Sequence, residues 1–330
     1  MSNETFKILT IDGGGVKGLY SSTILEHLEE KHDGNISDYF DMICGTSTGG
    51  LIALALSLKI PTKEISDIYL QNGGEIFPKR NKIVNMYNQI FGKGKFSDKA
   101  LKKVLVEIFG DRKLAESNNL LCIPSYSVTE ARPWVFKYDH KEGDLSRDNK
   151  AKYVDVALAT SAAPTYFPMA EIDYYDNKQF IDGGVWANDP TLVGLIEALT
   201  YYVGDGKQFK KLKILSISSL NKTGGKRTGL KRERGFIDWS NDLFETSLNG
   251  QSIFTNYFME KIKSISDVSI EYVRIPTAEI FSDQEGLIQL DVATRDALDL
   301  IRGKGNDMAQ LFKKKIEVND FFKTRKLHNI

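Results

Sequence analysis

The sequence predicts a layered α/β fold with a mainly parallel central sheet, formed by a single domain over residues 1–330. Two strand–turn–helix units follow each other directly near the N-terminus. Farther along, strand-like runs and helical patterns alternate, with no internal repeat and no convincing domain boundary. This alternation is typical of helices packed on both faces of a parallel sheet, so we expect three layers, α/β/α.

The two N-terminal units share one pattern. The first has an apolar, strand-like run at residues 7–11, then Asp12 and three glycines, then apolar residues at helical spacing from Val16 to Leu28. The second has a strand at 39–44, a turn of small residues at 45–50 and a helix at 51–58. This last helix is apolar almost all round, as a buried helix would be.

The remaining elements follow from hydrophobic periodicity. We expect further strands at 120–129, 134–138, 178–181, 212–220 and 269–275. Helices are expected at 63–70, 97–109, 153–160, 191–201, 239–265 and 294–312. Within the one domain this gives a core at about 6–195, an extension at 196–312 and a basic tail at 313–330.

Composition excludes several classes of protein. The 330 residues carry 44 Lys and Arg against 44 Asp and Glu, and this balance argues against a protein that binds nucleic-acid polymers. The only two cysteines, Cys44 and Cys122, are too few for a disulfide framework or a zinc site. No apolar run is long enough for a signal peptide or a spanning helix. We expect a cytoplasmic protein with reduced thiols and no metal.

The sharpest motif is the G-x-S-x-G at Gly45–Gly49, placed between a predicted strand and a predicted helix. In that context the motif is typical of a nucleophile elbow, whose sharp turn lifts a serine hydroxyl to the N-terminus of the following helix. Ser47 is therefore the candidate nucleophile. The alternative is a small-residue turn that serves only close helix–strand packing.

A second glycine-rich segment, Asp12–Gly18, also satisfies G-x-G-x-x-G through Gly13, Gly15 and Gly18. As a dinucleotide site it needs an acidic residue at the tip of the next strand, and that strand ends in Cys44 instead. As an oxyanion hole it offers backbone N–H groups beside the elbow, because neighbouring parallel strands end at the same edge. The second interpretation uses both turns together, whereas an ordinary connection has no need of three glycines.

The candidate base is a carboxylate. A serine nucleophile needs a proton acceptor, and none of the four histidines (His27, His32, His140 and His328) is well placed, so we expect each to be a surface residue. Asp182 follows a short strand and opens the sequence Asp-Gly-Gly. Taken alone, that sequence is an ordinary turn.

Together these segments resemble the patatin-like phospholipase family, whose members use a Ser–Asp dyad. The family's oxyanion segment is similar to Asp12–Gly18, its elbow to Gly45–Gly49 and its aspartate motif to Asp182–Gly184. The likeness extends over about 300 residues. It includes the sequence ATSAAPTYFP at 159–168, Asn188-Asp189-Pro190 and, more weakly, residues 216–224, 272–275 and 291–293.

The resemblance implies that Ser47 attacks an acyl ester of a phospholipid or lysophospholipid and that Asp182 accepts its proton. Backbone N–H groups of Gly13, Gly14 and Gly15 would stabilise the oxyanion, without a cofactor. The motif neighbours are Lys17, Gly18, Gly45, Gly49, Gly183 and Gly184. Two positions depart from the family pattern: Lys17 replaces an arginine, and Asp189 replaces an asparagine and is expected to cap the next helix.

The resemblance also raises the hypothesis of an antiphage effector that degrades membranes when a cyclic oligonucleotide activates it, with the basic, Gly-rich residues 221–235 as an anion site. Two rival functions are a non-catalytic storage or binding protein on the same fold and a dinucleotide-dependent oxidoreductase.

Two basic segments could bring the protein to a membrane surface. Residues 75–96 mix apolar side chains with Lys79, Arg80, Lys82, Lys93 and Lys95, which suits either a lid on an anionic bilayer or a partly buried helix. The tail at 313–330 has a formal charge of +4 and interleaved aromatic residues. It is either solvated, a further membrane contact or a site for a regulatory anion.

Overall fold

A computed structural model describes residues 5–79, 94–140, 142–143, 145–222, 225, 228–229, 231–233 and 236–326. Most of the predicted basic segment at 75–96 and parts of the Gly-rich segment at 221–235 lie outside the described residues, as does His328. The expectations of a lid and of an anion site fall mostly on these residues. The lid is wrong for the described end of its segment: Phe96 is buried in the core and the Lys95 ammonium pairs with the buried Asp291 carboxylate.

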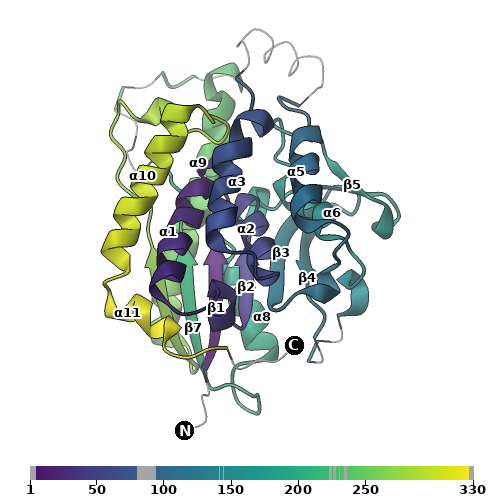
Figure 1. The fold of residues 1–330 in the computed structure, drawn as a ribbon, viewed down its shortest axis with the longest axis vertical. Coiled ribbons are helices and arrows are strands. Elements are labelled where there is room, and N and C mark those ends of the chain that lie inside the picture. The colour runs from purple at the N-terminus through teal and green to yellow at the C-terminus, as the bar shows by residue number, and fades with distance from the viewer. Residues whose placement is uncertain are drawn as a thin grey trace.

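One eight-stranded sheet runs through the described chain, in the order β5-β6-β3-β2-β1-β7-β8, with β4 paired to β3 (Figure 1). The pairs β3–β2, β2–β1, β1–β7 and β7–β8 are parallel. Strands β4 and β6 run antiparallel to β3, and β5 runs antiparallel to β6. The strands are β1 (Thr5–Ile11), β2 (Met42–Gly45), β3 (Leu120–Ser127), β4 (Arg132–Lys137), β5 (Ala170–Ile172), β6 (Lys178–Asp182), β7 (Lys211–Ile217) and β8 (Ser269–Ile275).

Helices cover both faces of the sheet, because successive strand residues point to opposite sides. On β1, Phe6 and Ile8 pack toward α8 and α9, whereas Leu9 and Ile11 pack toward α1 and α2. The predicted three-layer α/β/α arrangement is confirmed. The helices are α1 (Gly18–Lys31), α2 (Thr48–Ser57), α3 (Thr62–Ile76), α5 (Lys99–Phe109), α6 (Tyr153–Ser161), α7 (Gly184–Ala187), α8 (Thr191–Tyr201), α9 (Phe236–Ile265), α10 (Arg295–Phe312) and α11 (Ile316–Asn319).

Several predicted boundaries were wrong. The strand expected at 39–44 begins only at Met42, because residues 36–39 form a 3₁₀ turn. The helix expected to end at residue 70 continues to Ile76, and at Gly73 it lies beside Ala293 and Leu298. The three-residue strand β5 was missed because it is too short to show periodicity.

The C-terminal segment is docked on the sheet through its apolar side chains, whereas the basic side chains of Lys314, Lys323 and Arg325 are exposed. Phe321 is fully buried and Phe322 is 6% exposed. The Lys7 ammonium on β1 donates a hydrogen bond to the Phe321 carbonyl at 3.1 Å. Burial lowers the pKa of Lys7 to about 8. These aromatic rings are therefore part of the core and are not available for membrane contact.

Candidate active site

The serine of the predicted elbow lies in the turn between β2 and α2. Ser47 has φ 54° and ψ −126°, which places a residue other than glycine in a left-handed backbone conformation. Its glycine neighbours are required by close packing: a Cβ on Gly45 would lie 2.1 Å from the Gly49 carbonyl oxygen, and one on Gly49 would lie 2.2 Å from the Ile11 carbonyl oxygen. The turn therefore presents Ser47 at the positive end of the α2 dipole.

Thr160 at the end of α6 holds this turn in place. Its hydroxyl accepts a hydrogen bond from the Ser47 N–H at 3.0 Å and donates one to the Pro124 carbonyl at 2.6 Å. Thr160 and Pro124 are buried and Ser47 is partly buried, and the Thr160 hydroxyl satisfies two backbone groups at once. The sequence offered no distinct signal for Thr160, which lies in the ATSAAPTYFP segment.

The pairing of β3 brings Ser47 and Asp182 together. β2 pairs with β3 at residues 120–122, and β6 pairs with it at 125–127, where Asp182 is in register with Ser125. β4 occupies the other side of β3 over residues 122–127, so β2 and β6 lie one after the other on the same side. Because β2 is parallel to β3 and β6 antiparallel, their C-terminal ends point toward each other.

Asp182 is a buried carboxylate that contacts the serine. It is 3% exposed, accepts a hydrogen bond from the Gly184 N–H at 2.7 Å and accepts another from the Ser47 hydroxyl. Burial raises the pKa of Asp182 from 3.8 to about 7, although both hydrogen bonds lower it. A carboxylate with such a pKa can accept a proton near neutral pH.

The glycine-rich turn lies against the same site, but its three N–H groups are not equivalent. Gly14 and Gly15 line the cavity that contains Ser47 and Asp182. The Gly13 N–H instead donates to the Asn188 carbonyl at 2.9 Å. The expectation that Gly13 donates to an oxyanion is therefore corrected: this N–H already has an acceptor, and the candidate donors are those of Gly14 and Gly15.

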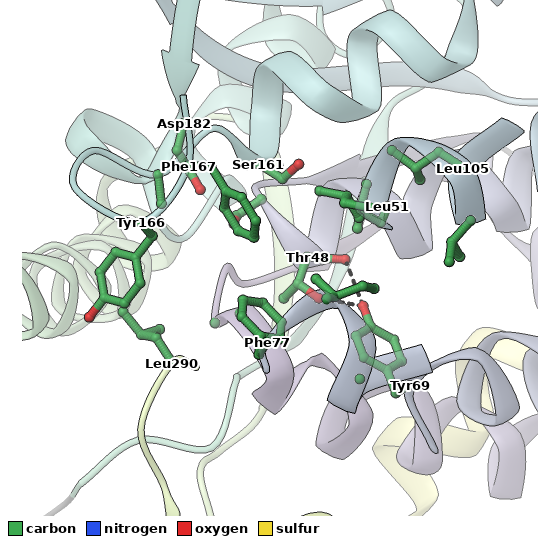
Figure 2. Close-up of a pocket in the computed structure, with 18 of the residues that line it drawn as sticks. Thr48, Leu51, Tyr69, Phe77, Leu105, Ser161, Tyr166, Phe167, Asp182 and Leu290 are labelled. Atoms are coloured by element: carbon green, nitrogen blue, oxygen red, sulfur yellow. Dashed lines mark hydrogen bonds between the residues drawn. The ribbon is translucent and has the colours of Figure 1, made fainter. Parts of the chain in front are cut away.

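An apolar cavity of about 1050 Å³, including its open mouth, leads away from these polar groups (Figure 2). Helices α2, α3 and α5 supply half of the residues that line it. Phe77, Tyr166 and Phe167 lie nearer to Asp182, whereas Leu105 lies on the far side, beyond Leu51 (Figure 2). A wall of this composition can hold a long hydrocarbon chain.

The other predicted residues have supporting positions. Lys17 is buried outside the cavity, its ammonium donates to Asn221 Oδ1 at 3.1 Å, and burial lowers its pKa to about 8. A Cβ on Gly18 would lie 2.2 Å from Thr48 Oγ1, and one on Gly183 would lie 2.3 Å from the Pro124 carbonyl oxygen. Asp189 Oδ1 accepts from the Thr191 N–H at 3.0 Å near the start of α8.

None of the three histidines that the structure describes lines the cavity. The expectation that all are surface residues is wrong for His140, which is 7% exposed because its imidazole packs against Tyr202 and faces Glu197 at 3.3 Å. His27 lies between Glu30 and Asn306, and His32 stacks on Phe322. No helix among the described residues has the length and apolarity needed to cross a membrane.

Sequence reasoning gave no functional role to Asn188 or Arg274. Asn188 lines the cavity and supplies the carbonyl that holds Gly13. Arg274 on β8 contacts Asp12 and Asp189. The only local signal of this contact is an arginine within a predicted strand, and this signal does not show that Asp12 and Asp189 are its partners.

Several known proteins are similar to this chain over most of its length. The family model described as patatin-like phospholipase matches residues 9–195. A cGAMP-activated phospholipase of Pseudomonas aeruginosa is 31% identical over 309 residues, covering 93% of this chain and 88% of that protein. One of Vibrio cholerae is 28% identical, covering 96% and 94%. Among solved structures, VipD from Legionella pneumophila aligns with a TM-score of 0.41 and 12% identity, covering 92% of this chain and 67% of that one.

Proposed function

This chain belongs to the patatin-like phospholipase family, and from that premise we propose that it hydrolyses fatty-acyl esters of phospholipids or lysophospholipids through Ser47 and Asp182. One observation carries the proposal. A serine on a strand–helix elbow shares an apolar cavity with a buried carboxylate that accepts a hydrogen bond from its hydroxyl.

The reaction proceeds in two halves. Ser47 Oγ attacks the ester carbonyl carbon while the Asp182 carboxylate takes the hydroxyl proton. Collapse of the tetrahedral intermediate breaks the bond to the glycerol oxygen, which leaves with that proton. Water then attacks the acyl-serine ester, gives a proton to Asp182 and releases the fatty acid, and the proton returns to Ser47.

The oxyanion of each tetrahedral intermediate is placed at the glycine-rich turn. The N–H groups of Gly14 and Gly15 are the proposed donors, and the N-terminus of α2 adds a favourable dipole. The acyl chain is placed in the cavity toward Leu105, beyond Leu51 as seen from Asp182. A substrate presented by a bilayer requires peripheral association of the protein with the membrane surface.

The decisive measurement is fatty-acid release from mixed phospholipid vesicles, followed by mass spectrometry. We expect Ser47→Ala and Asp182→Asn to lose at least about a thousandfold in rate while remaining folded. Ser161→Ala is a matched control, since Ser161 also lines the cavity but donates its hydroxyl to the Ala157 carbonyl at 2.6 Å. Full activity in Ser47→Ala would contradict the proposal and favour a non-catalytic binding role for this site.

A second proposal concerns regulation, in which a cyclic dinucleotide activates hydrolysis. It is supported by the names of relatives that align over nearly the whole chain, which are cGAMP-activated phospholipases. We expect micromolar cyclic dinucleotide to raise fatty-acid release, whereas the linear dinucleotide of the same bases does not. Equal rates with and without the cyclic compound, together with no binding by calorimetry, would contradict it.

A further inference from the structure

A buried arginine joins the two loops that carry the proposed catalytic groups. Arg274 Nη2 lies 2.5 Å from Asp12 Oδ2, and Nη1 lies 2.9 Å from Asp189 Oδ2. Nη1 also donates to Ser216 Oγ at 2.5 Å. The Arg274 side chain is 13% exposed and both carboxylates are fully buried.

The register of the sheet explains how this side chain reaches the site from the edge strand. Arg274 on β8 is in register with Ser216 on β7, which is in register with Thr10 on β1. All three side chains therefore point to the same face of the sheet. Because serine and threonine are short, the guanidinium can lie across β7 and reach the end of β1.

Each aspartate that Arg274 contacts is next in the chain to a loop of the site. Asp12 immediately precedes Gly13, Gly14 and Gly15. Asp189 immediately follows Asn188 in the chain segment that comes after Asp182. The Asn188 carbonyl accepts the hydrogen bond from the Gly13 N–H at 2.9 Å. The Arg274 guanidinium thus connects the glycine-rich turn to the chain segment that follows Asp182, the proposed base.

We propose that Arg274 is a positioning residue, which sets the separation between the N–H donors of the glycine loop and the nucleophile–base pair by clamping Asp12 to Asp189. Sites of this kind tolerate displacements of only about 0.5 Å. The guanidinium is suited to the task because its rigid fork donates hydrogen bonds to Asp12 while Nη1 forms an ion pair with Asp189. The proposal rests on the proposed function for its effect on catalysis, whereas its effect on loop mobility is independent of turnover.

Further hydrogen bonds leave the clamp little freedom. Thr191 Oγ1 donates to Asp189 Oδ1 at 2.5 Å and lies 2.8 Å from Thr10 Oγ1. Burial raises the pKa of Asp12 to about 7, and Arg274 is the strongest influence that lowers it. Without Arg274, two buried carboxyl groups would face each other with no cation between them.

The test compares Arg274→Lys with the wild type by amide hydrogen exchange and by turnover of a soluble short-chain ester. Lysine keeps the charge but offers a single ammonium, which cannot hold both carboxylates in the same geometry. We expect exchange at residues 12–17 and 186–191 to be at least about tenfold faster. We also expect kcat to fall about 10- to 100-fold, with KM changed less than about threefold, because the loss concerns the transition state.

A matched control and a second variant distinguish positioning from general destabilisation. Arg147→Lys makes the same change at another Arg–Asp pair, where Arg147 Nε lies 2.7 Å from Asp148 Oδ1, and should leave kcat and both loops unchanged. Asp189→Asn keeps the Asp12–Arg274 contact and should lower kcat by itself. In the double variant with Arg274→Lys the two losses should be less than multiplicative, because both break one clamp.

Three results would each overturn the proposal: unchanged loop exchange in Arg274→Lys, an equal loss of kcat in Arg147→Lys, or fully multiplicative losses in the double variant. If Arg274→Lys does not fold, Asp189→Asn decides through the same two readouts. Failure of the proposed function would be seen separately, as activity retained by Ser47→Ala, and the exchange comparison would still test the clamp.

Discussion

Replacement of Asp182 with asparagine should raise the stability of the protein above pH 7, although it abolishes hydrolysis. Burial raises the pKa of Asp182 from 3.8 to about 7, against the hydrogen bonds from Ser47 and the Gly184 N–H. Between pH 4 and 7 the folded protein therefore keeps a proton that the unfolded chain has released. Because the unfolded state binds fewer protons in this window, the free energy of unfolding falls as pH rises through it.

The magnitude follows from the pKa values. At 1.36 kcal/mol per pH unit, a pKa raised from 3.8 to about 7 corresponds to about 4 kcal/mol of lost stability once the carboxylate is ionised. Asparagine has nearly the same shape, and its Oδ1 can still accept the Gly184 N–H. Most of this free energy should therefore be recovered, which for a chain of this length raises Tm by roughly 5 °C.

Scanning calorimetry at pH 5 and pH 8 measures this difference, with Asp111→Asn as a control. Asp111 is an exposed carboxylate paired with Lys152, and hydrogen bonding to that lysine lowers its pKa, so its replacement should not stabilise the protein. The gain from Asp182→Asn should be large at pH 8 and small at pH 5. A Tm at or below that of the wild type at both pH values would refute the reasoning from burial.

The same ionisation predicts the pH dependence of the wild-type reaction. A general base acts only when ionised, so kcat/KM for a soluble ester should rise about tenfold per pH unit below pH 7 and level off above it. A profile already level at pH 5 would mean that the pKa of Asp182 is not raised in the free enzyme.

Four further substitutions test other parts of the structure. Gly15→Ala should abolish ester hydrolysis and lower Tm, because φ is +59° and a Cβ would lie 2.2 Å from the Leu290 carbonyl oxygen. By contrast, Gly303 lies in open space on α10, so Gly303→Ala should raise the free energy of unfolding in urea by about 0.5–1 kcal/mol. Leu105→Trp fills the far part of the cavity and should lower kcat/KM about tenfold for a hexadecanoyl ester but not for a butanoyl ester, and equal losses would contradict the proposed acyl path. Phe321→Ala should cost about 3–5 kcal/mol of unfolding free energy, since the ring is fully buried, and a cost below about 1 kcal/mol would show that the C-terminal segment does not stay docked.

Much of the fold could be predicted because its signals are local. An apolar run that ends in small residues predicts a strand followed by a tight turn. Glycines indicate positions where two backbone segments pack closely, as at Gly45 and Gly49. Helix ends were predicted less well. Past residue 70, α3 lies beside Ala293 and Leu298, which are far away in the chain and leave no local signal of this contact.

In the candidate site too, some features could be predicted from the sequence and others were found only in the structure. The sequence by itself predicted the elbow around Ser47 and the glycine-rich turn, because neighbouring residues form each motif. Asp182 was preferred to a histidine through the family resemblance, since its Asp-Gly-Gly alone predicts an ordinary turn. Only the tertiary structure decided that β2 and β6 end against each other along β3, that the Gly13 N–H is taken by Asn188 and that Arg274 joins two loops. Strand registers and the desolvation of charges arise from contacts between distant segments, and no local pattern of residues encodes them.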